Sequence, residues 1–321
     1  GKPEKPFMAE ASLCQAAREG DVARVRTLLE ERVHPDTTDD RWPGTRALLF
    51  AAQENHAEIV ELLLEYGATF DARTEHEMTA LILATCRGST AAVEAMLRRA
   101  RPQLEAELSY ELADGSCALG IAAYQDQPDI VRLLLAAGAD VNFKTASRRV
   151  PRCGENGMST NGGSALHKAT AACIPLLLEA RADINSLDWS RRTALMRCCR
   201  LGRDEGVAEL LRAGADVTLR DEDGRTALHY AAEQCSTVMI RALVEAGADL
   251  FAEDRTHATP FRIVDSLPQV RLEHQPIEEG VYYTDEIPEA LWIYGERAGQ
   301  QECRELLKEL MDLALMTKSA R

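Results

Sequence analysis

The sequence predicts an all-α repeat solenoid, in which pairs of helices stack one on the next along the chain. Two recurring segments support this fold class. Gly-Ala-Asp tails begin at Gly138, Gly214 and Gly247, and the last two follow Thr-Ala-Leu starts at Thr193 and Thr226. Self-similarity with a period of about 33 residues is typical of stacked helix pairs. Such a stack usually offers a long concave binding surface and no catalytic pocket.

A pair of small residues on the first helix of each unit gives the register of the repeats. The second residue of this pair recurs at spacings of mostly about 33 residues, and the spacings lengthen where the chain has insertions. We therefore expect about eight repeats, of which the first and the last are irregular. The marker residues are Ala17, Ala52, Thr85, Ala123, Thr170, Cys199, Ala232 and Asp265.

The repeat that begins at Thr226 shows why each unit is expected to fold as a helix pair. The Thr226 hydroxyl can accept a hydrogen bond from a free backbone N–H at a helix start. Leu228, Ala231 and Ala232 follow at helical spacing and share one face. The small pair lets a neighbouring helix approach closely. Gly247 supplies the left-handed residue that ends the second helix.

In register, the chain carries Thr-Ala-Leu-His at Thr226, Glu-Ile-Val-Glu-Leu-Leu-Leu from Glu58 and Gly-Ala-Asp-Val-Asn from Gly138. With these motifs the chain resembles the ankyrin-repeat family over residues 11–315. The resemblance implies antiparallel helix pairs joined by β-hairpin fingers, a general role in binding other proteins, and no reaction. It also implies that the motif histidines, His167 and His229, bond to a neighbouring finger backbone and are structural.

The repeats give the expected domain organisation, which has five segments. Residues 1–10 form an N-terminal tail that in part precedes a natural start at Met8, residues 11–143 form repeats one to four, residues 144–163 form a loop insertion, residues 164–258 form repeats five to seven, and residues 259–321 form an irregular last repeat with an insertion and a C-terminal capping helix.

Two repeats depart from the pattern in informative ways. Repeat three lacks the Gly-Ala-Asp tail, and the acidic residues 105–114 are expected to lengthen its finger. Repeat five is short, and Pro175 lies where its second helix should begin. We expect truncated helices there, and we expect repeat five to be the weak point of the stack.

Composition narrows the class of protein further. Apolar residues make up 45% and charged residues 28% of the 321 residues, as in ordinary globular chains, and no apolar run is long enough for a membrane span. The N-terminus has no apolar stretch of a secretory signal. The net charge of −15 disfavours a surface for nucleic-acid phosphates and permits a basic partner. We expect a monomer with capped ends.

The cysteines favour a reducing compartment. Most of the nine cysteines fall on or beside expected helices, where cysteine behaves as a small apolar residue. The adjacent Cys198 and Cys199 point in different directions on a helix, which disfavours one shared metal site. We therefore expect free thiols and a cytoplasmic or nuclear location.

Motifs for catalysis and cofactor binding are missing from the sequence. It has no dinucleotide fingerprint after a strand, no phosphate-binding loop and no nucleophile elbow. The histidines lack metal-ligand spacing. The sequence therefore predicts a protein that is not an enzyme and that has neither a cofactor nor a metal.

We expect the function in the fingers and first helices, whose exposed residues would bind a protein or peptide. Trp42 and Trp189 are the candidate apolar anchors, although each could instead fold back on the next finger. Acidic residues around them favour a partner rich in Lys and Arg. The full candidate set is Trp42, Glu75, Tyr124, Asp188, Trp189, Arg200, Asp221, Glu222, Asp223, Glu233 and Glu253.

Two alternatives remain open at this stage. In one, Trp42 or Trp189 and nearby acidic residues form a cage that reads methylated lysine. In the other, the chain is an enzyme whose site lies in the irregular C-terminal segment. The residues of that site would be Tyr282, Tyr283, Asp285, Glu286, Trp292 and Tyr294.

Overall fold

The computed structural model describes six stretches of the chain, and within them two compact units. The described stretches are residues 6–39, 42–99, 104–113, 115–144, 162–267 and 298–319, with backbone alone at residues 6–12, 39, 42–44, 298 and 317–319. Contacts between Cα atoms divide these residues between Asp183 and Ile184. We call the part before this division unit 1 and the part after it unit 2, and each is described by itself.

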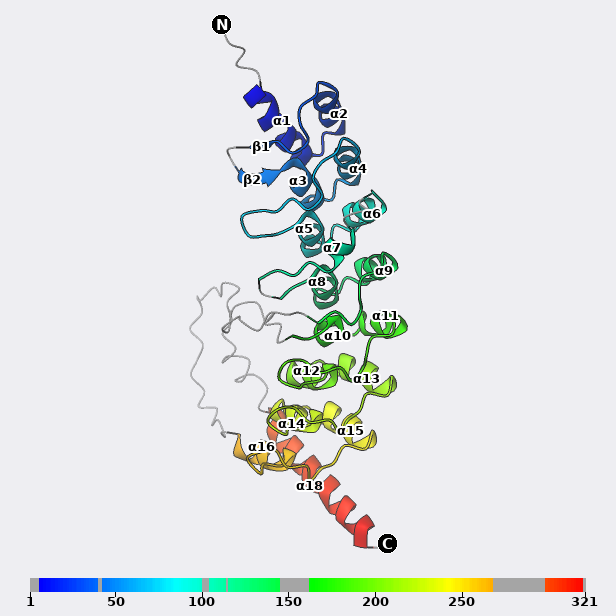
Figure 1. Cartoon of the computed structure of the whole chain (residues 1–321). Coiled ribbons are helices and arrows are strands. Elements are labelled where there is room, and N and C mark those ends of the chain that lie inside the picture. The colour runs from blue at the N-terminus through cyan, green and yellow to red at the C-terminus, as the bar shows by residue number, and fades with distance from the viewer. Residues whose placement is uncertain are drawn as a thin grey trace, which may run out of the picture. The chain divides into compact units, whose positions relative to one another are not determined.

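Unit 1 consists of helix pairs with one short hairpin (Figure 1). Its elements are α1 (Pro6–Glu19), α2 (Val22–Glu30), β1 (Thr38–Asp39), β2 (Trp42–Arg46), α3 (Ala47–Gln53), α4 (Ala57–Glu65), α5 (Ala80–Arg87), α6 (Thr90–Arg99), α7 (Leu104–Leu108), α8 (Ala118–Tyr124), α9 (Pro128–Ala136), α10 (Ala165–Lys168) and α11 (Ile174–Glu179). The first helices α1, α3, α5, α8 and α10 pack on one another in that order, and α2, α4, α6, α9 and α11 form a second row.

Unit 2 continues the same design. Its elements are α12 (Ala194–Arg200), α13 (Asp204–Arg212), α14 (Ala227–Glu233), α15 (Thr237–Glu245), α16 (Pro260–Ser266) and α18 (Ala298–Ser319). Helix α12 packs on α14 and α14 on α16, while α13 packs on α15 and α15 on α18. The expected all-α repeat solenoid is confirmed as a fold class.

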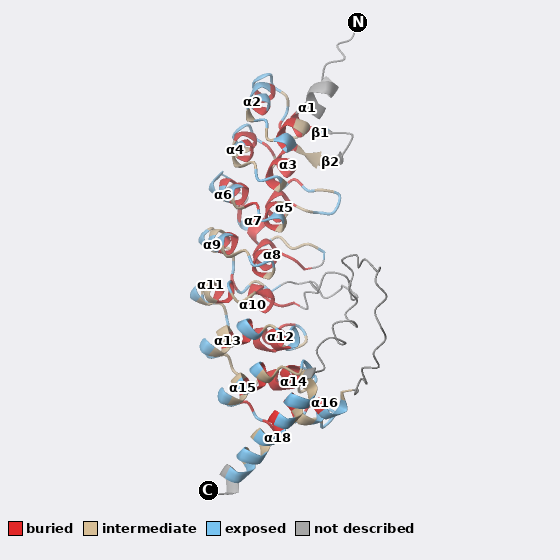
Figure 2. Ribbon diagram, turned by 180° about the vertical axis from the view of Figure 1, so that it is seen from behind, coloured by how far each residue is buried: buried red, intermediate tan, exposed pale blue. Residues whose placement is uncertain are grey.

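The small pairs of the first helices are buried, as expected from their spacing. Ala51 and Ala52 of α3, and Ala231 and Ala232 of α14, are fully buried. Figure 2 shows the first helices α3, α8 and α10 as largely buried. Small side chains leave room for the next helix, so the larger side chains can fill the space between rows. Cys198 and Cys199 of α12 occupy the same position, and burial raises the pKa of Cys198 to about 11.

The finger between α2 and α3 is a short antiparallel hairpin of β1 and β2. The finger before α5 has a single bridge, between Arg73 and Thr79. In unit 2 the described fingers are instead tight turns, and they carry no strand pair. The resemblance implied hairpin fingers throughout, so the strands are fewer than it implied. The aspartate side chains described below close these turns in place of a backbone ladder.

Among the described second helices, α4, α9, α13 and α15 end at a left-handed glycine, whereas α2 and α11 end at a left-handed arginine. Gly214 and Gly247 have φ angles of +83° and +93° with open space where a Cβ would lie. At the matching place in repeat five stands Arg181, with a φ of +67°. A side chain with a Cβ is disfavoured in this conformation by about 1–2 kcal/mol.

The helices of repeat five are as short as the sequence predicts. Helix α10 has four residues and α11 has six, and Pro175 lies in the first turn of α11. These short helices make fewer backbone hydrogen bonds than the seven-residue and nine-residue helices α14 and α15. Together with Arg181, these short helices support the expectation that repeat five is the weak point of the stack.

Repeat three contains a helix where a longer finger was expected. Residues 104–108, at the start of the acidic stretch, form α7, because Leu104 and Leu108 are four residues apart and both are buried. The same burial includes Glu107, which is 4% exposed. The hydroxyl of Thr79 donates to its carboxylate, and the Oε2 atom has no hydrogen-bond partner among the described residues. Burial is the main cause that raises the pKa of Glu107, against the opposing effects of Thr79 and Arg73.

The last described helix, α18, packs on unit 2 through its N-terminal half. Cys303, Leu306 and Leu307 are buried. The Gln300 amide donates to the backbone oxygens of Val264 and Leu267, at 2.9 and 3.1 Å, at the end of α16. That α18 is a C-terminal capping helix stays a prediction. Residues 145–161 of the expected loop insertion and residues 268–297 before α18 lie outside the described residues.

We predict that repeat five opens before the repeats of unit 2. Amides from Leu166 to Leu178 should exchange hydrogen faster than amides from Leu228 to Leu243, because the shorter helices of repeat five have fewer contacts to break. Hydrogen exchange measured by mass spectrometry checks this. Arg181→Gly, which relieves the left-handed strain, should slow the exchange of repeat five. Equal protection of both segments would contradict the expectation.

We also predict that Glu107→Gln stabilises the protein at pH 7 more than at pH 4.5. With the folded pKa raised above the unfolded value, the native state holds a proton that the unfolded state releases. The free energy of unfolding therefore falls as the pH rises from about 4.5. Thermal unfolding of both proteins at the two pH values measures the difference. Glu105→Gln, on the exposed side of α7, is the matched control and should show no such gain.

Candidate functional site

Three turns of unit 2 precede its first helices, and each begins with an aspartate. These turns, residues 188–192, 221–225 and 254–258, are called the finger turns below. The Asp188 carboxylate accepts from the backbone amides of Ser190 and Arg192, at 2.9 and 2.8 Å. Asp221 accepts in the same way from Asp223 and Arg225, at 2.9 and 2.8 Å. Each carboxylate thus holds its own turn closed.

Asp254 closes the third finger turn in the same manner. Its Oδ1 atom accepts from the amides of Thr256 and Ala258, at 2.8 and 3.0 Å. Hydrogen bonds from Thr256 and Ala258 lower the pKa of Asp254, although burial opposes them as the largest single effect. The three turns therefore share one geometry at the same place in successive repeats.

The geometry of the finger turns changes the interpretation of two residues that were expected to be exposed for binding. Asp188 and Asp221 were expected to be exposed, but they are 5% and 6% exposed. Their oxygens are used within the turns, so they do not face a partner. The signal that was missed is that Asp188, Asp221 and Asp254 recur at the repeat period. A residue type that returns at every repeat points to the scaffold, because partner contacts differ from one repeat to the next.

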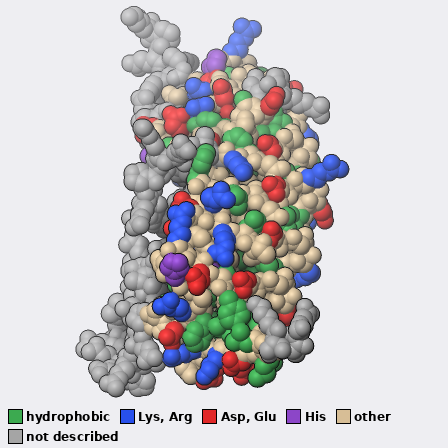
Figure 3. All heavy atoms as spheres, turned by 60° about the horizontal axis from the view of Figure 1, so that its bottom comes forward, with side chains coloured by type: hydrophobic (Ala, Val, Ile, Leu, Met, Phe, Trp, Pro, Cys, Tyr) green, Lys and Arg blue, Asp and Glu red, His purple; other side chains and the backbone are tan. Residues whose placement is uncertain are grey.

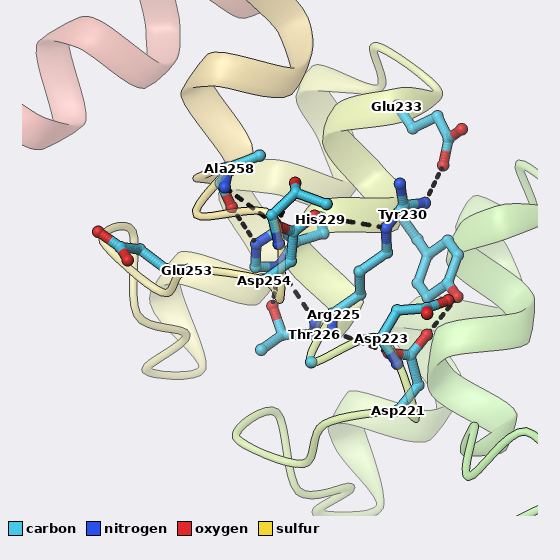
Figure 4. Close-up of polar contacts among 12 residues, drawn as sticks. Asp221, Asp223, Arg225, Thr226, His229, Tyr230, Glu233, Glu253, Asp254 and Ala258 are labelled. Atoms are coloured by element: carbon cyan, nitrogen blue, oxygen red, sulfur yellow. Dashed lines mark hydrogen bonds and ion pairs between the residues drawn. The ribbon is translucent and has the colours of Figure 1, made fainter.

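A polar cluster behind the turns links them to α14 (Figure 4). The Tyr230 hydroxyl donates to Asp221 Oδ2 at 2.5 Å. Burial, with this carboxylate, raises the pKa of Tyr230, so the hydroxyl keeps its proton. The Arg225 guanidinium lies 3.3 Å from Glu233 Oε2 and 3.7 Å from Asp254 Oδ2. Arg225 therefore joins the second finger turn to the third.

His229 lies at the centre of this cluster and is fully buried. Its Nδ1 atom lies 3.1 Å from the Thr226 amide, which must donate, and 2.9 Å from the Thr226 hydroxyl. Its Nε2 atom then carries the proton and donates to Ala258 O at 3.1 Å. Burial lowers the pKa of His229, which keeps the ring neutral. His229 thus bonds to the neighbouring finger backbone, as the resemblance implied.

The finger turns also bond to one another through their backbones. The Glu222 amide donates to Ser190 O at 3.1 Å, and the Arg255 amide donates to Asp223 O at 2.8 Å. The Arg220 guanidinium donates to Glu253 O at 2.5 Å. We call the surface formed by residues 188–192, 221–225 and 253–258 the finger ledge.

The finger ledge carries most of the expected binding residues that are exposed. Trp189 is 48% exposed, so it is neither buried in the fold nor fully in water. Glu222, Asp223 and Glu253 are exposed on the following turns. The Oε2 atom of Glu253 lies 2.9 Å from Nδ1 of His257, and both side chains are exposed. The contact is an ion pair only when His257 is protonated.

The remaining candidates lie elsewhere. Arg200 and Glu233 are exposed at the ends of α12 and α14, and Glu233 already pairs with Arg225. Glu75 is exposed and Tyr124 is half-buried, and both belong to unit 1. The side chain of Trp42 lies outside the described residues. The residues of the alternative C-terminal enzyme site lie there too.

One residue that the sequence reasoning missed is Arg197 of α12. At the matching position other repeats hold Phe50, Ile121 or Tyr230, whereas repeat five holds Lys168. Arg197 and Lys168 are both buried. Basic residues at this position in two successive repeats were the available signal.

Among the described residues, no three His, Cys, Asp or Glu side chains form a group that could hold a metal ion. Across those same residues, no helix is both long and apolar enough to cross a membrane.

Comparisons with known proteins match the sequence to one family. A family model described as ankyrin repeats (3 copies) matches residues 13–106, 71–145, 148–221 and 173–254. In the solved ankyrin repeat domain of Bcl-3, the match covers 78% of this chain and 92% of that chain, with 23% identity and a TM-score of 0.47.

Curated relatives match over parts of their length. E3 ubiquitin-protein ligase KEG of Arabidopsis thaliana is 30% identical over 174 residues, which are 52% of this chain and 9% of that protein. Ankyrin repeat and SOCS box protein 6 of Homo sapiens is 30% identical over 158 residues, or 49% of this chain and 34% of that protein. GA-binding protein subunit beta-2 of Mus musculus is 45% identical over 67 residues, or 21% of this chain and 16% of that protein. The chain thus spans about a third or less of the length of these relatives.

We predict that Asp221→Ala destabilises unit 2 by at least about 2 kcal/mol, because a buried donor left without an acceptor costs about 1–3 kcal/mol. The change leaves two amides and the Tyr230 hydroxyl without their acceptor. Glu222→Ala, at the next residue, should change stability by at most about 0.5 kcal/mol. Chemical denaturation followed by circular dichroism measures both. Similar losses from the two variants would mean that the Asp221 contacts do not support the fold.

Proposed function

Because the chain belongs to the ankyrin-repeat family, whose members generally mediate protein–protein interaction, we propose that it is a non-catalytic scaffold or adaptor. Its ligand is a protein or peptide bound on the finger turns and first helices. The observation that supports this proposal most is Trp189, a large aromatic side chain left 48% exposed on a closed turn.

Trp189 has the properties of an interface anchor. Tryptophan is among the residues that contribute most to binding energy at protein interfaces. The turn that carries it is held by Asp188 and bonded to the next turn through Ser190 and Glu222. A surface that is already ordered loses less conformational entropy on binding.

The charge of the finger ledge suggests what the partner carries. Glu222, Asp223 and Glu253 are exposed there, whereas Asp188 and Asp221 are used inside the turns. The exposed carboxylates would pair with Lys or Arg side chains at the edge of the interface. Such pairs mainly speed association and orient the partner.

We place the protein in the cytoplasm or the nucleus, and we propose that it is a monomer by itself. Most of the described cysteines are buried, where cysteine acts as a small apolar residue, and this suits a reducing compartment. A relative 29% identical over 53% of this chain, from Gallus gallus, is the nuclear factor NF-kappa-B p105 subunit. We do not assign the activities of these relatives to this chain, because the matches cover only small parts of the relatives.

A capture experiment tests the proposed function. The immobilised full chain and its Trp189→Ala variant are incubated with the same lysate, and the retained proteins are compared by quantitative mass spectrometry. Proteins that the wild type retains and the variant loses are partners of the finger ledge. Val238→Ala removes an exposed apolar side chain from α15 and is the matched control, which should retain the same partners.

With a purified partner, Trp189→Ala should weaken binding by at least about 2 kcal/mol and act mainly on dissociation. Glu253→Ala should mainly slow association, and binding should weaken as salt rises, because exposed charge pairs are screened beyond about 8 Å at physiological ionic strength. Surface plasmon resonance separates the two rates. Binding that neither salt nor Trp189→Ala changes would remove the finger ledge as the binding surface.

A further inference from the structure

Arg197 is a buried charged side chain, at a position that holds the buried Lys168 one repeat earlier. It lies on α12 and is 5% exposed. Its Nε atom is buried and has no hydrogen-bond acceptor among the described residues. An ionised group without a partner is costly to bury. The fold does not require a charge there, since Tyr230 fills the same position one repeat later.

The charged groups around Arg197 make this position more unusual. Arg200, Arg192 and Arg203 repel its charge, whereas Asp188 attracts it. Together with burial, which is the largest cause, this repulsion lowers the pKa of Arg197 to about 10. The Asp188 carboxylate already accepts from Ser190 and from Arg192. We call Arg192, Arg197, Arg200 and Arg203 the α12 arginine cluster.

The cluster is open to solvent at one side. Arg200 is exposed at the end of α12, and its backbone oxygen accepts from Gln234 at 2.8 Å. The Arg192 side chain is largely covered, and its Nε atom donates to Asp188 at 3.2 Å. Trp189 lies in the turn that carries Arg192. The four arginines of the cluster therefore come from α12, from the residue before α13 and from the finger turn that also carries Trp189.

The net charge of the chain does not describe this part of the surface. The formal charge is −15, yet basic and acidic side chains are interspersed on the face seen in Figure 3. At the α12 arginine cluster the local charge is positive. A local cluster of this size suits a short anionic segment, whereas the negative charge of the whole chain opposes a long nucleic acid.

We propose that the α12 arginine cluster binds an acidic peptide segment of a partner protein, whose Asp or Glu carboxylates supply the acceptors that Arg197 lacks. Guanidinium groups match carboxylates because two parallel N–H donors meet two oxygens. This inference rests on the proposed function, because it assigns a second chemistry to the same binding surface. With acidic residues at the later finger turns, a partner of mixed charge binds in one orientation.

The test uses a fluorescein-labelled hexaglutamate peptide and the full chain, with binding followed by fluorescence anisotropy. Hexaglutamate should bind, and both Arg197→Met and Arg200→Met should weaken its binding at least about ten-fold. Arg241→Met removes an exposed arginine from α15, away from the cluster in sequence, and should leave the affinity unchanged. Absence of binding, or equal binding by all variants, overturns the proposal.

Thermal stability gives a second readout that a structural arginine would not produce. Arg197→Met replaces an unpaired buried charge by an apolar side chain of similar length, so its Tm should rise while its affinity falls. A lower Tm would show that the fold itself satisfies Arg197, and the proposal would fail. Arg200 is exposed, so Arg200→Met keeps the binding test valid if Arg197→Met does not fold.

Two more probes separate this inference from the proposed function. Hexalysine should bind the acidic part of the finger ledge and should not respond to Arg197→Met. If hexalysine or a captured partner binds through Trp189 while hexaglutamate does not bind, the scaffold proposal stands and the arginine proposal fails. A hexathymidylate that binds as tightly as hexaglutamate, with the same loss in the variants, would overturn the assignment to an acidic peptide.

Discussion

Each helix pair buries its apolar face only against the next pair, and the close approach of the first helices makes this possible. The small residues at Ala51 and Ala52, and again at Ala231 and Ala232, leave the space that the neighbouring helix occupies. Without this contact a single pair would expose most of its apolar surface, since a repeat has no core of its own. The positions of the turns and of the exposed side chains on them depend on this packing.

Polar contacts fix the orientation of neighbouring repeats relative to one another. Apolar contacts hold neighbouring repeats together without fixing their orientation, whereas hydrogen bonds do fix it. His229 bonds to Ala258 and Arg225 pairs with Asp254, so each turn of unit 2 is positioned by the repeat beside it. These contacts order the finger ledge before any partner arrives. The exposed side chains of the finger ledge therefore lie on turns that are already ordered before a partner binds.

The residues that break the repeat pattern are of two kinds. Arg181 replaces a glycine and adds strain, and Glu107 places a carboxyl group among apolar side chains. Both reduce stability, and nothing in the structure assigns them a function. Arg197 also reduces stability, but it lies among other arginines, and one of these shares a finger turn with the exposed Trp189. Departures from local rules are expected where stability is given up for binding, and the surroundings separate this case from simple strain.

The sequence by itself determined the fold class, the helix faces and the structural histidine. These features depend on the order of residues within one repeat, and the pattern returns often enough to be read without coordinates. The sequence also located the short helices of repeat five, because Pro175 and the missing residues act locally.

Only the tertiary structure decided which side chains of a turn face inward. Asp221 and Glu222 are neighbours of similar chemistry, yet the first is buried by its turn and the second is exposed. The same holds for Glu107 and Arg197, whose burial is set by residues that the chain brings from other helices. The direction of a side chain in a turn depends on the hydrogen bonds that the turn makes. The burial of a charged side chain depends on which residues of the next repeat cover it. The spacing of residues within one repeat predicts neither this burial nor the direction of a side chain in a turn.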